Sequence, residues 1–262
     1  MMSSFIKIKP QILYAPMLAT FGGGSVRGFG RGIGGGLNVE AVDVFGDGSG
    51  LLFYDFENDL GEKGGNYSTS ANSVVQGNHN PQLGGGSLRT QTSSGYLHIT
   101  NFEQSDTSAW SCSFWFRRTN NSQLSVNNRM VDFHEHRSSK GTTISYENDG
   151  QFHFILRCNE HGNGSRVVGN KNTLCNNQMH HIVVGCSSSA VPFAHVDNTR
   201  QSNSNSGQNR SDSQENNGVK FGYGFGNGMG SVDTIYDNIR FFNKELTEAE
   251  CSELYDAEYA LI

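Results

Sequence analysis

Short stretches in which apolar and polar residues alternate recur along most of the chain, and this pattern constrains the fold more than any other feature. Residues 110–118, WSCSFWFRR, would place Trp110 and Phe114 on one face of an extended strand and Trp115 on the other. Residues 151–157, QFHFILR, alternate in the same way. Turn-forming Gly, Asn and Ser residues separate these stretches, so the sequence predicts an all-β sandwich or barrel built from many short strands.

Two further stretches predict which side chains share a strand face. Residues 181–186, HIVVGC, are almost continuously apolar, which is typical of a strand covered on both faces. In an extended strand His180 and His181 would point to opposite faces, so they could not bind one metal ion together. Alternation over residues 233–242, DTIYDNIRFF, predicts one face that carries Ile235, Asp237, Ile239 and Phe241.

One helix is predicted, at the C-terminal end. Within residues 243–259, NKELTEAECSELYDAEY, Thr247 is followed three residues later by Glu250, which is the spacing of a capping box at a helix N-terminus. The side chains at helical spacing on one stripe are Cys251, Leu254, Tyr255 and Tyr259. We expect this stripe to dock on the sandwich.

Charge and cysteine content narrow the classes of function. The formal net charge is -6 and the pI is about 5.8, which gives no reason to expect nucleic acid as a partner. The five cysteines form no CxxC pair, and the first residues lack the apolar run of a signal peptide. We therefore expect buried free thiols in a protein made in a reducing cytosol, with no membrane as a partner.

The order of several motifs resembles a known domain family. Residues 179–184, MHHIVV, and 194–199, AHVDNT, are similar to two consecutive strands of laminin-G-like, concanavalin A-like jelly rolls. Residues 235–255, IYDNIRFFNKELTEAECSELY, are similar to the last strand and the closing helix of that family, and SGYLHI and WSCSFWF match two earlier core strands. The resemblance covers residues 49–262. It implies an antiparallel two-sheet jelly-roll sandwich with a short C-terminal helix.

Residues 1–48 differ from the rest of the chain because they show no sustained hydrophobic period. Residues 20–36, TFGGGSVRGFGRGIGGG, contain nine glycines, and glycine loses more backbone freedom on ordering than any other residue. No helical pattern follows the GxGxxG within this run, so we do not expect a dinucleotide site. We expect residues 1–48 to form an extended arm that becomes ordered against a partner, with a short strand and a turn over residues 38–50.

The arm also resembles a known segment. YAPMLATFGGGSVRGFGRG, followed by VDVFGDGSG, is similar to the leader of virion proteins from tailed phages, especially marine ones, where it precedes a laminin-G-like module. The resemblance implies a homo-oligomeric virion protein that is assembled in the host bacterial cytoplasm and whose arm contacts other virion proteins. The side chains expected to make these contacts are Phe21, Arg27, Phe29 and Arg31.

Carboxylates near the start of the predicted sandwich have the spacing of a catalytic motif. Glu57, Asp59 and Glu62 follow the Glu-x-Asp-x-x-Glu pattern of retaining β-glucanases of the same broad fold. The residues between them favour a surface turn over a central strand, so we predict no enzyme activity. The resemblance to family members with structural calcium implies a second possibility, a calcium ion held by Asp55 and Asp59 of this turn and by Asp237 of the last predicted strand. A sandwich without a metal is the alternative.

Histidine and aromatic side chains supply the remaining candidate sites. A His-x-His pair on one strand face can bind zinc, and a polar outer face is the other interpretation of the same residues. The residues considered for this metal site are Asp132, His134, His136, His153 and His161. For carbohydrate binding, Tyr223 and Phe225 are candidate aromatic platforms close to Asn-rich loops.

Three hypotheses for function follow, in order of preference. The first is a structural virion component of a tailed phage, anchored to the capsid or tail by its arm, with the lectin-like sandwich facing outward. The second is attachment to host surface glycans by the sandwich, as in a tail-fibre lectin. The third is a glycan hydrolase.

Overall fold

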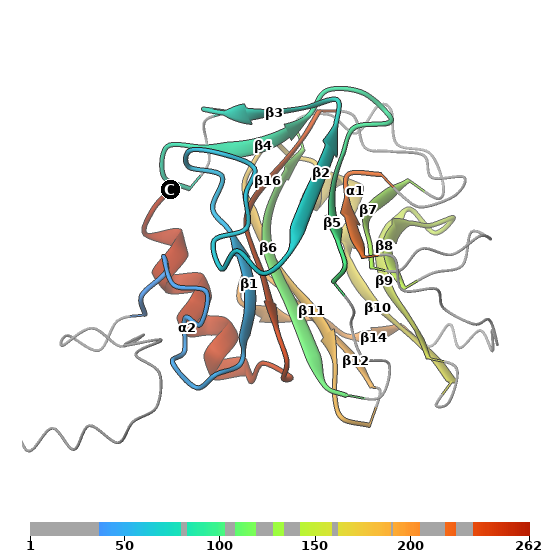
Figure 1. The fold of residues 1–262 in the computed structure, drawn as a ribbon. Coiled ribbons are helices and arrows are strands. Elements are labelled where there is room, and N and C mark those ends of the chain that lie inside the picture. The colour runs from blue at the N-terminus through green and yellow to red at the C-terminus, as the bar shows by residue number, and fades with distance from the viewer. Residues whose placement is uncertain are drawn as a thin grey trace, which may run out of the picture.

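The computed structural model describes residues 37–79, 83–102, 108–118, 128–133, 142–158, 162–189, 191–204, 218–223 and 233–262. Its strands form two antiparallel sheets that face each other, and helix α2 (Glu248–Tyr259) lies on the outside of one of them (Figure 1). The predicted fold class, a two-sheet jelly-roll sandwich with a short C-terminal helix, is therefore confirmed. A second short helix, α1 (Lys171–Leu174), follows a strand of the other sheet.

The first sheet has the strand order β13–β12–β11–β6–β16–β4–β3, and β1 also pairs with β16. Its strands are β1 (Gly50–Tyr54), β3 (Val74–Gly77), β4 (Ser87–Thr90), β6 (Trp110–Arg118), β11 (His180–Cys186), β12 (Pro192–Val196), β13 (Thr199–Arg200) and β16 (Thr234–Phe242). The second sheet has the order β14–β10–β9–β8–β7–β15–β5–β2. Its strands are β2 (Ser68–Asn72), β5 (Tyr96–Thr100), β7 (Arg129–Asp132), β8 (Thr143–Tyr146), β9 (Gln151–Cys158), β10 (Gly162–Asn170), β14 (Asn203–Ser204) and β15 (Val219–Phe221).

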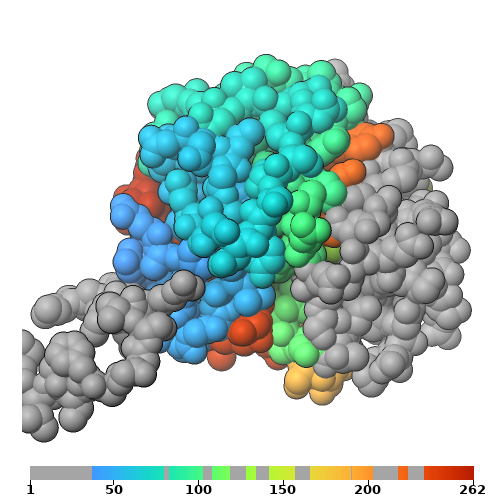
Figure 2. Space-filling model, in the orientation of Figure 1, coloured from blue at the N-terminus to red at the C-terminus, as the bar shows by residue number. Residues whose placement is uncertain are grey.

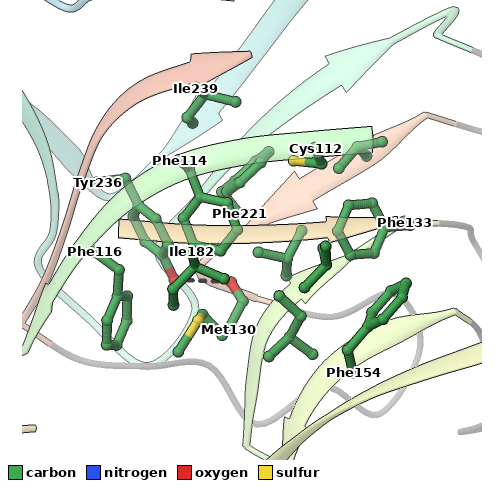
Figure 3. Close-up of a cluster of buried hydrophobic side chains, with 14 of the residues drawn as sticks. Cys112, Phe114, Phe116, Met130, Phe133, Phe154, Ile182, Phe221, Tyr236 and Ile239 are labelled. Atoms are coloured by element: carbon green, nitrogen blue, oxygen red, sulfur yellow. Dashed lines mark hydrogen bonds between the residues drawn. The ribbon is translucent and has the colours of Figure 1, made fainter. Parts of the chain in front are cut away.

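The hydrophobic core fills the space between the two sheets. As the alternation in β6 predicts, Phe114 points into this core, whereas Trp115 points to the outer side of the first sheet. Buried Tyr236 joins the two sheets, because its hydroxyl donates a hydrogen bond to the carbonyl oxygen of Met130 at 2.8 Å (Figure 3). A buried tyrosine hydroxyl needs such a partner, so this bond lets an aromatic ring fill the core without an unsatisfied polar atom.

Strand β16 departs from the simple alternation predicted for it. Tyr236, Ile239 and Phe241 face the core, so the expectation that Ile235 and Asp237 share that face is wrong. The cause is an irregularity in the pairing of β16 with β6 just after Asp237, where the next residue, Asn238, has φ of 43°. An extra residue at a bulge reverses the faces of the residues that follow it.

Residues 38–48 form turns, not the short strand predicted from the sequence. Gly46 and Gly48 have φ values of 67° and 81°, which a regular strand does not contain. The carboxylate of Asp43 accepts a hydrogen bond from the backbone N–H of Gly48 at 2.9 Å and holds the turn closed. Figure 2 shows these first described residues, in blue, beside the red C-terminal segment.

Helix α2 begins with the predicted capping box. The Thr247 side chain accepts a hydrogen bond from the backbone N–H of Glu250, and the Glu250 side chain accepts one from the backbone N–H of Thr247. Cys251 and Leu254 are buried against the outer face of the first sheet, as predicted. The rest of the predicted stripe differs in part, because Tyr259 is 54% exposed and the buried residue in that turn is Glu258.

Candidate functional site

The outer face of the second sheet carries a small group of aromatic and basic side chains. In β5, Leu97 and Ile99 point into the core, so Tyr96 and His98 point outward. Strand β15 pairs with β5 and places Lys220 opposite His98. We call the group of Tyr96, His98, Lys220 and Tyr223 the tyrosine surface.

The two tyrosine rings of this surface lie close together. Their centroids are 6.3 Å apart, and Lys220 Nζ lies 4.6 Å from the centroid of the Tyr96 ring. All four side chains are partly exposed. Half-exposed aromatic rings beside polar and charged groups offer an apolar face together with hydrogen-bonding groups, which is what a sugar ring requires.

The tyrosine surface is only partly predictable from the sequence. Tyr223, a predicted aromatic platform, lies on this face. Tyr96 was not among the predicted residues, although the alternation of SGYLHI indicates that this tyrosine points away from the core. The other predicted aromatic residue, Phe225, lies outside the described residues.

The three carboxylates with glucanase spacing hold backbone turns. Glu57 accepts hydrogen bonds from the backbone N–H of Gly85 at 2.8 and 3.1 Å, and Asp59 accepts one from Gly61 at 2.8 Å. Glu62 accepts one from Gly64 at 2.7 Å. Residues 55–67 contain no strand, so the predicted surface turn is confirmed and the carboxylates are not aligned on one strand face.

The structure does not bring the three calcium candidates together. Asp55 forms an ion pair with Lys63 at 2.8 Å, while Asp59 binds its own turn. Asp237 is fully buried and accepts a hydrogen bond from the backbone N–H of Leu83 at 3.0 Å, and burial raises the pKa of its carboxyl well above the usual value. Among the residues that the structure describes, no three His, Cys, Asp or Glu side chains are grouped as metal ligands.

Of the residues considered for a histidine metal site, the structure describes Asp132 and His153. Asp132 is buried and forms an ion pair with Arg129, and His153 Nε2 lies 2.8 Å from a carboxylate oxygen of Asp149. His134, His136 and His161 lie outside the described residues, as do Phe21, Arg27, Phe29 and Arg31 of the predicted arm. The four cysteine side chains that are described are buried thiols outside any disulfide, as expected.

A buried polar network lies on the outer side of the first sheet, beneath α2. Glu258 of α2 accepts hydrogen bonds from Arg240 Nε at 2.9 Å and from Trp115 Nε1 at 2.7 Å. His181 Nε2 lies 2.7 Å from Ser113 Oγ and 4.0 Å from the Glu258 carboxylate. Burial lowers the pKa of His181 to about 3, so its imidazole is neutral at pH 7.

The same network holds the first described residues on the sandwich. Arg240 donates further hydrogen bonds to the backbone carbonyl of Ala41, at 2.7 Å, and to that of Val39. Val44 and Phe45 are buried in one hydrophobic cluster with Leu254 of α2. The segment 37–48, assigned to the arm from the sequence, therefore contacts the sandwich closely.

Comparison with known proteins identifies the fold family. The model of the family Laminin_G_3, of the concanavalin A-like lectin/glucanases superfamily, matches residues 91–252, more than half of the chain. The chain belongs to this family. No curated protein matches the sequence of this Laminin_G_3 chain.

Several solved structures share the fold of this Laminin_G_3 chain. The binding domain of Paraclostridial Mosquitocidal Protein 1 has a TM-score of 0.57 and 15% identity, with 79% of this chain and 51% of that chain covered. The binding domain of botulinum neurotoxin DC, in complex with rat synaptotagmin II, has a TM-score of 0.58 and 17% identity, with 80% and 52% covered. The chain thus spans about half the length of these relatives, and at this level of identity the likeness shows the fold alone.

The family match covers some of the candidate features and leaves others outside it. Tyr96, Lys220 and Tyr223 lie within the matched residues, whereas segment 37–48 and Glu258 lie outside them. The chain therefore combines a lectin-like domain with segment 37–48, which lies outside the family match and packs on the outer face of the first sheet. No helix in the described part of the chain is long and apolar enough to cross a membrane.

Proposed function

We propose that this Laminin_G_3 chain is a structural virion component of a tailed phage, without enzyme activity. Residues 1–36 attach it to other virion proteins of the capsid or tail, and the sandwich faces outward as part of a homo-oligomer. The observation that carries this proposal is the position of segment 37–48. It packs with α2 on the outer face of the first sheet, so the chain enters the sandwich on the side opposite the tyrosine surface.

Attachment at one face leaves the opposite sheet available for contact with the surroundings of the particle. The glycine-rich sequence before Leu37 suits a segment that runs along a neighbouring subunit, because backbones can approach closely where side chains are absent. Its ordering entropy would then be offset only in the assembly. The absence of a catalytic role is supported by the use of Glu57, Asp59 and Glu62 as turn caps.

A direct localisation experiment tests this function. Virions purified from the phage that encodes the chain are labelled with an antibody raised against residues 49–262 and imaged by electron microscopy. The proposal predicts a regular, repeated label on the capsid or on the tail. Particles that carry no label, and that contain no peptide of the chain by mass spectrometry, would refute it.

A second candidate function, attachment to host surface glycans, is favoured by the tyrosine surface. Tyr223→Ala should abolish retention of the protein on a glycan array, because one wall of the aromatic pair is lost. Tyr259→Ala, which truncates an exposed tyrosine on the opposite outer face and leaves the tyrosine surface intact, is the matched control. Binding that survives Tyr223→Ala unchanged would remove this surface from consideration.

A further inference from the structure

A pocket opens at the edge of the sandwich, far from the tyrosine surface. It has a volume of about 320 Å³ and lies between β9 and β10 of the second sheet, β11 and β12 of the first sheet, and helix α1. In the second sheet, strands β8 and β7 separate β9 from β15, which carries Lys220 of the tyrosine surface. Pockets that bind small molecules measure about 300–1,000 Å³, so this one suits a ligand at the small end of that range.

Apolar side chains form part of the pocket wall, and the fold has already placed them. Val167, Leu174 and Val196 line it, and Leu174 is almost fully buried. Leu174 packs directly on Gly169, where a Cβ atom would lie 2.9 Å from Leu174 Cγ. The absence of a side chain at Gly169 therefore lets α1 close over β10.

Three amide side chains at the pocket are each oriented by a bond within the protein. Asn170 Oδ1 caps α1 by accepting hydrogen bonds from the backbone N–H of Asn172 at 2.9 Å and of Thr173 at 3.0 Å. Gln201 Nε2 donates to the carbonyl oxygen of Thr199 at 2.8 Å, and Gln151 Nε2 donates to the Asp149 carboxylate at 3.3 Å.

These bonds leave the opposite end of each amide for a ligand. Asn170 retains its Nδ2 donor, whereas Gln151 and Gln201 retain their Oε1 acceptors. A ligand that matches this set must both donate and accept hydrogen bonds at neighbouring positions. Hydroxyl groups do both, and an oriented amide loses little side-chain entropy when it binds one.

The ionisable side chains at the pocket are bonded to other groups of the protein. His180 Nδ1 lies 2.7 Å from Asp197 Oδ2, and His180 Nε2 lies 2.9 Å from Asn176 Oδ1. The other oxygen of Asp197 accepts a hydrogen bond from the backbone N–H of His181 at 2.9 Å. No lysine or arginine is among the described residues that line the pocket, and both ring nitrogens of His180 already bond to protein oxygens, so an anionic ligand would find no basic side chain left to pair with.

We propose that this pocket binds a neutral, polyhydroxylated small molecule of the size of a single sugar ring. The apolar walls contact its C–H groups, and the three amides bind its hydroxyl groups. The inference goes beyond the proposed function, because it concerns a different sheet edge and requires neither the arm nor the tyrosine surface.

The test is a titration of the full 262-residue, 15N-labelled chain, followed by the backbone amide signals in NMR spectra. The probes are glucose, galactose and N-acetylglucosamine, with glucuronate as the charged comparison. We expect saturable shifts at Asn170, Thr173 and Gln201 with at least one neutral sugar and weaker binding of glucuronate. The proposal is overturned if no neutral sugar produces a saturable shift there, if the shifts are confined to the tyrosine surface, or if glucuronate binds more tightly.

Two variants separate the amide contact from general effects. Asn170→Asp keeps an oxygen that caps α1 but removes the Nδ2 donor, so it should weaken sugar binding about threefold to tenfold. Asn172→Asp adds the same charge to α1 at a residue that does not line the pocket, and it should leave binding unchanged. Thr173→Trp, at an exposed lining residue, should fill the pocket and abolish binding. Equal affinity in Asn170→Asp and the wild type would contradict the proposal, whatever the fate of the tryptophan variant.

Discussion

Arg240 of β16 and Glu258 of α2 form a fully buried ion pair, in which Arg240 Nε donates to Glu258 Oε1 at 2.9 Å. Burial raises the pKa of Glu258 and lowers that of Arg240, because both charged forms lose water. The two remaining nitrogens of the Arg240 guanidinium donate hydrogen bonds to the backbone carbonyls of Val39 and Ala41. One guanidinium thus joins the central strand, the closing helix and the segment through which the N-terminal arm enters.

Breaking this pair should destabilise the sandwich strongly. In Arg240→Met the Glu258 carboxylate stays buried without its cation, so the free energy of unfolding should fall by roughly 3–5 kcal/mol. The matched control is Arg200→Ala, which removes an exposed pair with Glu248 and should cost less than about 1 kcal/mol. Urea denaturation measures the free energy of unfolding of both variants. Equal losses would show that the buried Arg240–Glu258 pair does not hold α2 and segment 37–48 on the sandwich.

Helix α2 should contribute to stability mainly through its buried apolar side chains. Leu254 is fully buried against the outer face of the first sheet, so Leu254→Ala should cost roughly 2–5 kcal/mol. Asp256→Ala changes an exposed residue of the same helix and should have little effect. If thermal unfolding showed negligible shifts for both variants, α2 would not be docked on its own sandwich in solution.

The sequence predicted the layers of the sandwich well, because alternation directly reports which face of a strand is buried. Phe114 and Trp115 fall on opposite faces as expected, and the capping box of α2 forms as predicted. Alternation could not reveal the irregularity after Asp237, because it depends on how β16 pairs with β6, and the sequence of one strand alone does not fix that pairing.

Buried charges were the main features that sequence reasoning missed. Glu258 lies four residues after Leu254, on the same helical stripe, but a glutamate in a C-terminal helix is usually read as a solvent-facing residue. Its burial depends on Arg240 and Trp115, which are distant in the sequence. The pocket beneath α1 was missed for a similar reason, because its walls come from strands of both sheets.

The buried histidine should make stability depend on pH. The pKa of His181 is lowered to about 3 in the folded chain, whereas an unfolded histidine titrates near about 6.5. Between these values the unfolded chain binds a proton that the folded chain does not. The free energy of unfolding should therefore decrease as pH falls below about 6.5, by up to about 1.4 kcal/mol per pH unit from this group.

His181→Gln isolates this contribution, because glutamine can still bond to Ser113 but does not titrate. The carboxyl groups of Glu258 and Asp237 titrate in both proteins, so the comparison between the two proteins removes most of their effect. Urea denaturation from pH 7 to pH 5 should give a steeper loss of stability for the wild type than for the variant. Parallel curves would mean that His181 is not held neutral by the fold.

The central claim, that residues 1–36 attach an independently folded sandwich to a virion, is tested most directly by deleting those residues in the phage. The cut falls before Leu37, because removing residues 37–48 as well would delete Val44 and Phe45, expose Phe242 and Leu254 that pack with them, and take away the carbonyls bound by Arg240. The measurement is the amount of chain in purified particles, by quantitative immunoblot, beside the melting temperature of the purified truncated protein. We predict an unchanged melting temperature and particles that lack the truncated chain. Incorporation at the level of the full-length chain would contradict it.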